Sequence, residues 1–288
     1  MRTALASLAL CLAACGEGPA DSSGAKPLPS FAEATEIPLA GRGEGERDFL
    51  LSQAPDGRGW VFTRMGPDNA LQLLTVKDPF SGEEPKPLFP GVRGDADAVF
   101  DPAGGTLLFM STGRHGDPER DDYDFYEATW EKGRAYGERP LEGLNTEHSE
   151  IYLTASQDGP MVFASSRPGG VGGNDLYEAV PSQDGYDIRA LDELNSPASD
   201  SNPFIFPSGE AMIFFSAKPG GFGGPDLYVT RRGDDGVWGE PVNLGEKVNT
   251  SGPDYAPSLS VDGRTLLFAR GPSIFAIDVA AVEALSGF

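Results

Sequence analysis

The sequence predicts an all-β protein, a five-bladed β-propeller of four-stranded antiparallel blades. Three observations lead to this prediction: a motif of about fifty residues recurs five times, short apolar runs alternate with turn residues, and the two ends of the chain complement each other. The 38 glycines and 25 prolines fall mainly between the apolar runs, where the turns of an all-β fold are expected. A period of this length built from short strands indicates repeated units that pack side by side.

A tight turn marks the first hairpin of each repeat. It contains Gly57, Gly104, Gly159, Gly209 and Gly263, which are 47, 55, 50 and 54 residues apart. Each glycine separates two strand-like runs, such as residues 255–260 and 265–269 in the last repeat. A turn between two such runs is typical of a β-hairpin, so we expect the first two strands of each blade on either side of these glycines.

Two further strands complete the expected blade. The third is predicted at residues 72–76, 124–129, 175–180, 226–230 and 274–279. The fourth is flanked by proline in most copies and is predicted at residues 87–89, 140–144, 188–191 and 241–244. Proline suits the outermost strand of a blade because an edge strand can lack one amide donor.

The fifth repeat has no fourth strand of its own. Residues 36–39 near the amino terminus have the same character as residues 240–244, and they can supply the missing strand. Pairing this segment with the last blade would close the ring and cover two open sheet edges. The alternative is an open solenoid, which needs a capping unit at each end that the sequence does not show.

Repeats three and four share a longer motif, Arg/Lys-Pro-Gly-Gly-x-Gly-Gly-x-Asp-Leu-Tyr, at residues 167–177 and 218–228. Together with the Ser/Asp-Gly turn and a Trp-Gly-Glu-Pro element, this motif resembles the WD-like repeats of TolB-type propellers. The resemblance covers residues 34–282. Repeats one and two depart from it, since residues 65–69 replace the glycine loop in one and an acidic segment replaces it in the other. The resemblance implies a propeller of the bacterial cell envelope.

The amino terminus has the pattern of a secretory signal. Arg2 precedes a short apolar stretch that ends in Leu-Ala-Ala-Cys15, and this ending resembles a bacterial lipobox. We therefore expect a signal peptide at 1–14, a lipid on Cys15, a tether over 15–33 and the propeller over 34–288. The alternative is a plain secretion signal with an incidental cysteine. Gly16, by its resemblance to enterobacterial lipoproteins, implies the outer membrane, so the expected location is the cell envelope.

The chain is strongly acidic, with a formal net charge of −22 and a pI near 4.3. Such a charge repels phosphate backbones and excludes nucleic acid as a partner. Contact with a membrane is expected only through the lipid anchor. The acidity has two further interpretations: solubility outside the cytoplasm, or binding of cations and cationic ligands.

One column of the repeat is acidic in every copy. Its members lie at the start of the first strand of each blade: Asp48, Asp95, Glu150, Asp200 and Asp254. The first strand is the innermost strand of a propeller, so these carboxylates could form a ring at one mouth of the channel and hold a cation or ligand. Alternatively, each carboxylate accepts backbone amide hydrogen bonds where one blade passes into the next.

A second candidate site is the acidic loop of the second repeat. It carries oxygen ligands of the kind that calcium prefers, at Asp117, Glu119, Asp121, Asp122 and Asp124. The loop lacks the glycine and the terminal glutamate of an EF-hand, so a solvated acidic loop is the competing interpretation. No other cofactor is expected. The glycine loops lack a phosphate-binding pattern, and Asp175 and Asp226 are expected to hold them closed.

The sequence favours a non-catalytic binding module for an envelope protein or glycan. No Gly-x-Ser-x-Gly elbow is present, and no complete catalytic set can be identified. The alternative is a carbohydrate-active hydrolase or lyase that uses carboxylates at the channel mouth. A third interpretation is an inert spacer. A catalytic site requires two carboxylates in different environments, whereas a binding module requires an apolar or mixed patch on a loop face.

Overall fold

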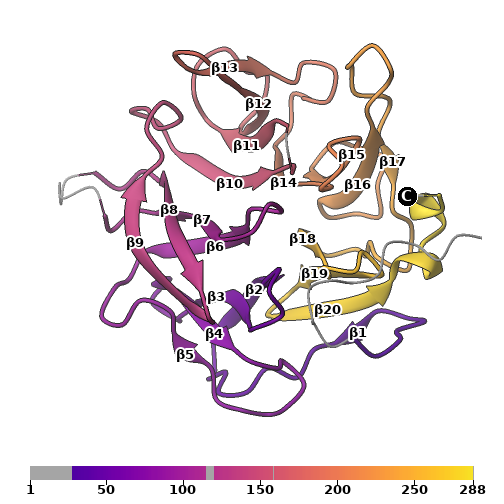
Figure 1. Cartoon of the computed structure of the whole chain (residues 1–288). Coiled ribbons are helices and arrows are strands. Elements are labelled where there is room, and N and C mark those ends of the chain that lie inside the picture. Colours follow the sequence, from indigo (N-terminus) through magenta and orange to yellow (C-terminus); the bar gives the residue numbers. More distant parts are fainter. Residues whose placement is uncertain (1–27, 115–119, 158, 288) are drawn as a thin grey trace, which may run out of the picture.

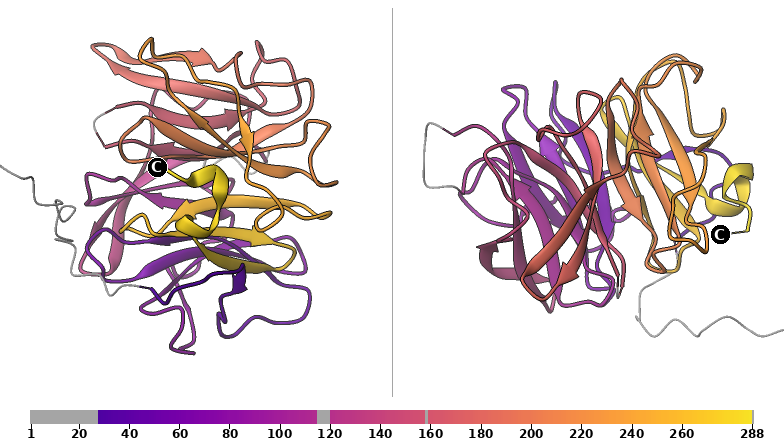
Figure 2. Two further views of the ribbon diagram at one scale, coloured as in Figure 1. Left: turned by 90° about the vertical axis from the view of Figure 1, so that its right-hand side faces the viewer. Right: turned by 90° about the horizontal axis from the view of Figure 1, so that it is seen from above.

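A computed structural model describes residues 28–114, 120–157 and 159–287. They form five four-stranded antiparallel sheets arranged around a central axis, which confirms the predicted five-bladed β-propeller (Figure 1). Figure 2 shows the ring from two further sides, with the short C-terminal helical turns on its outer rim. None of the described helices is long and apolar enough to span a membrane.

The strands follow chain order from the axis outward in the first four blades. Blade one contains β2 (Arg47–Gln53), β3 (Trp60–Met65), β4 (Leu71–Val76) and β5 (Lys86–Pro87). Blade two contains β6 (Asp95–Phe100), β7 (Thr106–Ser111), β8 (Asp124–Glu131) and β9 (Arg134–Pro140). Blade three contains β10 (Glu150–Ala155), β11 (Met161–Ser165), β12 (Asp175–Ser182) and β13 (Gly185–Ala190).

The remaining two blades complete the ring. Blade four contains β14 (Asp200–Ile205), β15 (Ala211–Ser216), β16 (Asp226–Arg231) and β17 (Val242–Asn243). Blade five contains β18 (Asp254–Leu259), β19 (Thr265–Arg270), β20 (Ser273–Asp278) and, from the other end of the chain, β1 (Thr35–Glu36). Two 3-10 turns follow β20, η1 (Val279–Ala281) and η2 (Glu283–Leu285).

The amino-terminal segment closes the ring as the sequence predicts. Thr35 pairs with Ala276, and the amide of Ile37 donates to the carbonyl of Ile274 at 2.8 Å. The segment already packs on blade five before β1 begins, because the Phe31 amide donates to the Asp278 carboxylate at 2.9 Å and the Phe31 carbonyl accepts from the Asp278 amide at 2.8 Å. The side chains of both Phe31 and Ile37 are buried.

The first hairpins lie where the sequence predicts them. Four of the five turn glycines adopt positive φ, at 67° for Gly57, 83° for Gly104, 75° for Gly209 and 70° for Gly263. Glycine enters this region without steric cost, which explains its recurrence at this position.

The fourth strand of blade two was predicted wrongly. It spans Arg134–Pro140 and therefore precedes the expected segment 140–144. Lys132 and Gly133 both adopt positive φ, so the chain reverses in two residues and Glu131 pairs directly with Arg134. Leu141 and Leu144 of the expected segment are instead buried in the core. Apolar residues alone therefore do not distinguish an edge strand from a buried linker.

The core is repeated from blade to blade. The second strand of every blade places one fully buried phenylalanine at the same position, namely Phe62, Phe109, Phe163, Phe214 and Phe268. These rings pack between neighbouring sheets, where five separate clusters of buried apolar side chains are found. The interfaces between blades, and not a single central core, therefore supply most of the hydrophobic stabilisation.

Candidate functional site

The acidic column lies at one end of the ring. Its five residues each begin the innermost strand of a blade, so all of them lie on the same side, together with the glycine loops that follow β11 and β15. We call this side the loop face, defined by the glycine loops 168–174 and 219–225 and the linkers 145–149, 195–199 and 249–253. All five acidic side chains are buried.

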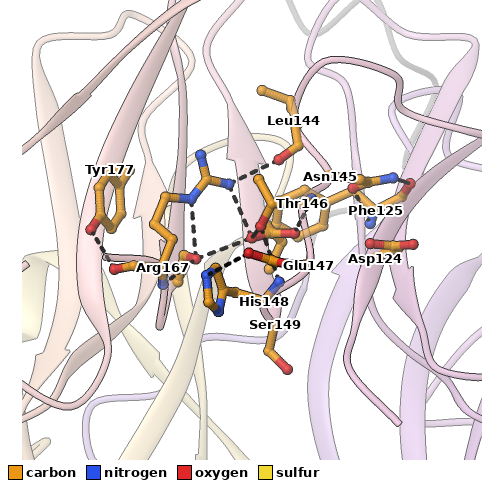
Figure 3. Close-up of polar contacts among 12 residues, drawn as sticks. Asp124, Phe125, Leu144, Asn145, Thr146, Glu147, His148, Ser149, Arg167 and Tyr177 are labelled. Carbon is orange, nitrogen blue, oxygen red and sulfur yellow. Dashed lines mark hydrogen bonds and ion pairs between the residues drawn. The ribbon is translucent and has the colours of Figure 1, made fainter. Parts of the chain in front are cut away.

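Glu150 is held at the junction of blades two and three, where Figure 3 labels Thr146, Arg167 and Asn145. The amide of Thr146 donates to Glu150 at 2.8 Å, and its hydroxyl donates to the same carboxylate at 2.7 Å. Arg167 lies 3.1 Å from Glu150 and donates to the Leu144 carbonyl at 2.8 Å. Asn145 accepts from the amide of Phe125 at 2.7 Å, so the linker is fixed to both blades.

Blade five repeats this arrangement. The amide of Thr250 donates to Asp254 at 2.7 Å, and Arg270 donates to the same carboxylate at 2.7 Å. Arg270 also donates to the Val248 carbonyl at 2.7 Å, while Asn249 accepts from the Leu227 amide at 2.9 Å. The carboxylate thus binds a backbone amide and a guanidinium at the passage from one blade to the next.

The first two blades pair the acid with arginine in the same way. Arg64 lies 2.7 Å from Asp48, and Arg114 lies 2.6 Å from Asp95. Four of the five acids therefore have an arginine partner of their own. In the part of the chain that the structure describes, no group of three or more His, Cys, Asp or Glu side chains is placed to hold a metal ion.

Blade four differs from the others. Ser196 donates from its amide at 2.6 Å and from its hydroxyl at 2.8 Å, and both bonds end on Oδ2 of Asp200. The position of the arginine is taken by Lys218, whose ammonium lies 4.3 Å from the centre of the Tyr228 ring. Asp200 Oδ1 is buried and has no hydrogen-bond partner.

A second feature of the axis lies two residues after each acid. The inner strand is irregular there, and the residue at this position has positive φ in every blade: Leu50, Asp97, Tyr152, Asn202 and Ala256. Four of the five line a small axial cavity. Leucine, tyrosine and alanine rarely adopt this conformation, so the bulge is imposed by the architecture and not by the residue type.

Asp97 is the only acidic residue among these five positions of positive φ. Its side chain is 2% exposed and neither carboxylate oxygen has a hydrogen-bond partner. Burial raises its pKa to about 8. The charge of Asp97 also adds to the burial that raises the pKa of Tyr123, Tyr152 and Tyr255. Sequence reasoning missed Asp97, and the only available signal was its place two residues after Asp95.

The candidate calcium loop is described only in part. Asp117 and Glu119 lie outside the described residues, as does Cys15 with residues 1–27. Asp121 is exposed, and Asp122 forms an ion pair with Arg120, which also lies 3.4 Å from Asp124. Arginine countercharge is therefore present beside Asp122 and Asp124. Calcium binding there stays a prediction.

The glycine loops end in exposed apolar side chains. Val171 is 57% exposed and Phe222 is 45% exposed. Asp175 accepts from the amide of Val171 at 3.1 Å, and Asp226 accepts from the amide of Phe222 at 2.7 Å. This confirms that the two aspartates hold the loops closed. Adjacent blades therefore present two apolar tips on turns that are fixed by buried carboxylates.

The opposite end of the axis opens into a cavity of about 290 Å³. All five inner strands or their hairpin turns line it, among them Gln53, Val99, Gln157, Phe204 and Val261. None of its described lining residues is charged. We call this cavity the axial funnel. It is largely apolar, whereas the loop face holds the buried charges.

No known protein-family model matches the sequence, and no curated protein matches it. Similar folds occur among solved structures. TolB from Acinetobacter baumannii is 18% identical with a TM-score of 0.48, over 85% of this chain and 53% of that one. This chain therefore spans about half the length of that protein.

Two further solved structures illustrate the range of proteins with a similar fold. TolB from Agrobacterium tumefaciens is 17% identical with a TM-score of 0.45, over 81% of this chain and 89% of that one. An oligogalacturonate lyase in complex with manganese is 14% identical with a TM-score of 0.42, over 79% of this chain and 64% of that one.

Proposed function

We propose that this protein is a lipid-anchored propeller of the cell envelope that binds an envelope protein through its loop face, without catalysis. The observation that carries the proposal is the pair of exposed apolar tips, Val171 and Phe222, on neighbouring blades. Apolar side chains that project from fixed loops are a common feature of protein interfaces, because little conformational entropy is lost when they are buried.

The contacts of the five acids in the column support a binding function over a catalytic one. A glycosidase mechanism needs two carboxyl groups in different environments and in contact with the substrate. Four of the five acids instead lie buried against arginine, as Asp254 does against Arg270. Asp97 has a raised pKa, but the equivalent residues of the other blades carry no carboxyl group. A paired carboxyl is therefore lacking at its level of the axis.

The geometry of the amino terminus fits an anchored module. Leu28 and Pro29 lie beside the hairpin turns that contain Gly57 and Gly263, at the end of the ring that carries the axial funnel. A lipid on Cys15 would therefore hold the funnel end toward the membrane. The loop face would then point away from the membrane and remain accessible to a partner.

Affinity capture from detergent-solubilised envelopes tests the binding function. The intact protein is compared with a Val171→Ser/Phe222→Ser variant and with a Val237→Ser/Val242→Ser control, which changes two exposed valines outside the glycine loops. We expect the intact protein and the control to retain one specific partner, and the loop variant to lose it. Equal recovery with all three proteins, or turnover of a glycan panel by the intact protein, would contradict the proposal.

The anchor is tested separately. Metabolic labelling with a palmitate analogue is expected to label the intact protein and not a Cys15→Ser variant. Fractionation of the envelope then shows which membrane holds the labelled protein. Secretion of an unlabelled intact protein would support a plain signal peptide instead.

A further inference from the structure

We propose that the fourth blade holds a binding site for a guanidinium group at Asp200, which an arginine side chain of the partner protein fills. This inference rests on the proposed binding function and names the chemistry of the partner. It follows from a difference among blades that are otherwise alike. Four blades supply a guanidinium at this place from their own chain, and blade four supplies lysine.

The four occupied positions show where the guanidinium lies. The side chains of the arginines are partly exposed, at 10% for Arg64, 16% for Arg114, 12% for Arg167 and 25% for Arg270, whereas the acids beneath them are buried. The guanidinium therefore approaches from the surface and covers a buried carboxylate. The same place in blade four is within reach of a group from outside the chain.

Blade four also contains the two kinds of hydrogen-bond acceptor that the guanidinium binds in the other blades. Arg167 and Arg270 each form an ion pair with an acid and donate to the carbonyl of the residue that precedes the linker asparagine, Leu144 and Val248 respectively. Leu194 occupies the equivalent position before Asn195. Asp200 Oδ1 is buried and has no hydrogen-bond donor. A planar group with several donors in a fixed fork matches two such acceptors better than an ammonium does.

Lys218 does not replace the arginine. Its ammonium lies over the ring of Tyr228, and Oδ1 of Asp200 is left without a hydrogen-bond partner. In blade three, Arg167 lies over the equivalent rings, 4.8 Å from Phe163 and 5.3 Å from Tyr177. An incoming guanidinium could therefore stack on Tyr228 once the flexible lysine chain moves aside.

The surroundings fit an arginine anchored in an interface. Asp200 pairs with Ser216 across β14 and β15, and Ser216 pairs with Asp226, whose Oδ1 is also buried without a partner. Asp226 holds the tip that carries Phe222. The tip that carries Val171 belongs to a loop whose Gly173 amide donates to the Ala198 carbonyl at 3.0 Å, two residues before Asp200. Apolar contacts around a buried charge are typical of interface hot spots, where arginine is enriched.

Small probes test the site without knowledge of the partner. The full-length protein in detergent is titrated with N-acetyl-arginine amide and, separately, with N-acetyl-lysine amide at the same ionic strength. Both probes carry one positive charge, so the comparison isolates the planar guanidinium. We expect saturable binding of the arginine probe in the millimolar range and at least tenfold weaker binding of the lysine probe. Absence of saturable binding, or equal binding of the two probes, would overturn the proposal.

Variants of the chain locate the site. Lys218→Arg would fill the place from within, so we expect it to abolish binding of the arginine probe while the protein unfolds at a higher temperature. Asp200→Asn removes the charge and is expected to abolish binding as well. Lys247→Arg, an equivalent change at a half-exposed lysine that lies 3.7 Å from Glu33, serves as the control and is expected to bind normally. Binding that persists in Lys218→Arg would overturn the proposal.

The two proposals can fail separately. If the intact protein captures its partner through the loop tips and Lys218→Arg captures it equally well, only the guanidinium site is wrong. If the arginine probe binds at Asp200 but no partner is captured, the guanidinium site is correct, and the proposed binding function and the partner's arginine are wrong.

Discussion

Arg270 covers the buried carboxylate of Asp254 in an ion pair in which Nε lies 2.7 Å from Oδ1, and the same guanidinium donates to the Val248 carbonyl of the preceding linker. One side chain thus fixes blade five to the chain segment that leads out of blade four. Removal of one partner of such a pair leaves a buried charge without compensation, which costs far more than the loss of an exposed pair. The junctions between blades therefore depend on these arginines.

We expect Arg270→Ala to lower the free energy of unfolding by about 3 kcal/mol, because Asp254 would remain buried and unpaired. Denaturant unfolding followed by tryptophan fluorescence measures the change. Arg139→Ala is the control, since Arg139 pairs with Glu127 on an exposed edge strand and should change stability by less than about 1 kcal/mol. Similar effects of the two substitutions would show that the pair with Asp254 is not structural.

Closure of the ring gives a second prediction. Ile37 follows β1 and is buried against blade five, so Ile37→Ala is expected to cost about 2–5 kcal/mol. We expect faster hydrogen exchange at Ile274, whose carbonyl accepts from Ile37, and at its neighbours in β20. Val242→Ala, an exposed position on β17, is the control. Unchanged exchange in β20 would contradict closure by the amino-terminal segment.

A third prediction concerns pH. The pKa of Asp97 is about 8 in the folded protein, above its value of 3.8 in an unfolded chain. The folded state therefore binds the proton more tightly, and the stability from this group is complete below about pH 4 and is lost as pH rises to about 8. The slope approaches 1.4 kcal/mol per pH unit at most. Burial and the charge of Asp97 raise the pKa values of Tyr123, Tyr152 and Tyr255, so these phenols stay neutral in this range.

Urea unfolding between pH 5 and pH 9 measures this dependence. Asp97→Asn is expected to flatten the curve, because asparagine keeps the size of the side chain and tolerates the positive φ of this residue but does not ionise. A curve that is unchanged in Asp97→Asn would assign the pH dependence to other groups.

The sequence predicted the blades and the ends of the ring well because hairpin turns and the repeat period are local signals. It also located the acidic column and, as one of two interpretations, the linker amides that bind Glu150, Asp200 and Asp254. It did not predict the arginine partners of the column. The arginine partners lie at unequal distances along the chain, sixteen residues after Asp48 and nineteen after Asp95, so no fixed spacing marks them. Asp97 was missed because the five residues at this position share a positive φ but have unrelated side chains. A left-handed bulge of this kind has no residue pattern of its own.

The last prediction concerns the rigidity of the glycine loop in blade three. A Cβ atom on Gly170 would overlap the carboxylate of Asp175, whereas a Cβ atom on Gly173 would meet only the Ser199 side chain at an ordinary distance of 3.8 Å. Gly170→Ala is therefore expected to displace Asp175 from the amides of Val171 and Gly172, which it now binds. Hydrogen exchange at those two amides should accelerate in Gly170→Ala and stay slow in Gly173→Ala. Since the tip must be fixed to bind tightly, partner capture should fall in the first variant only. Slow exchange in both variants would show that Asp175 does not hold the loop, and the basis for a rigid apolar tip would be lost.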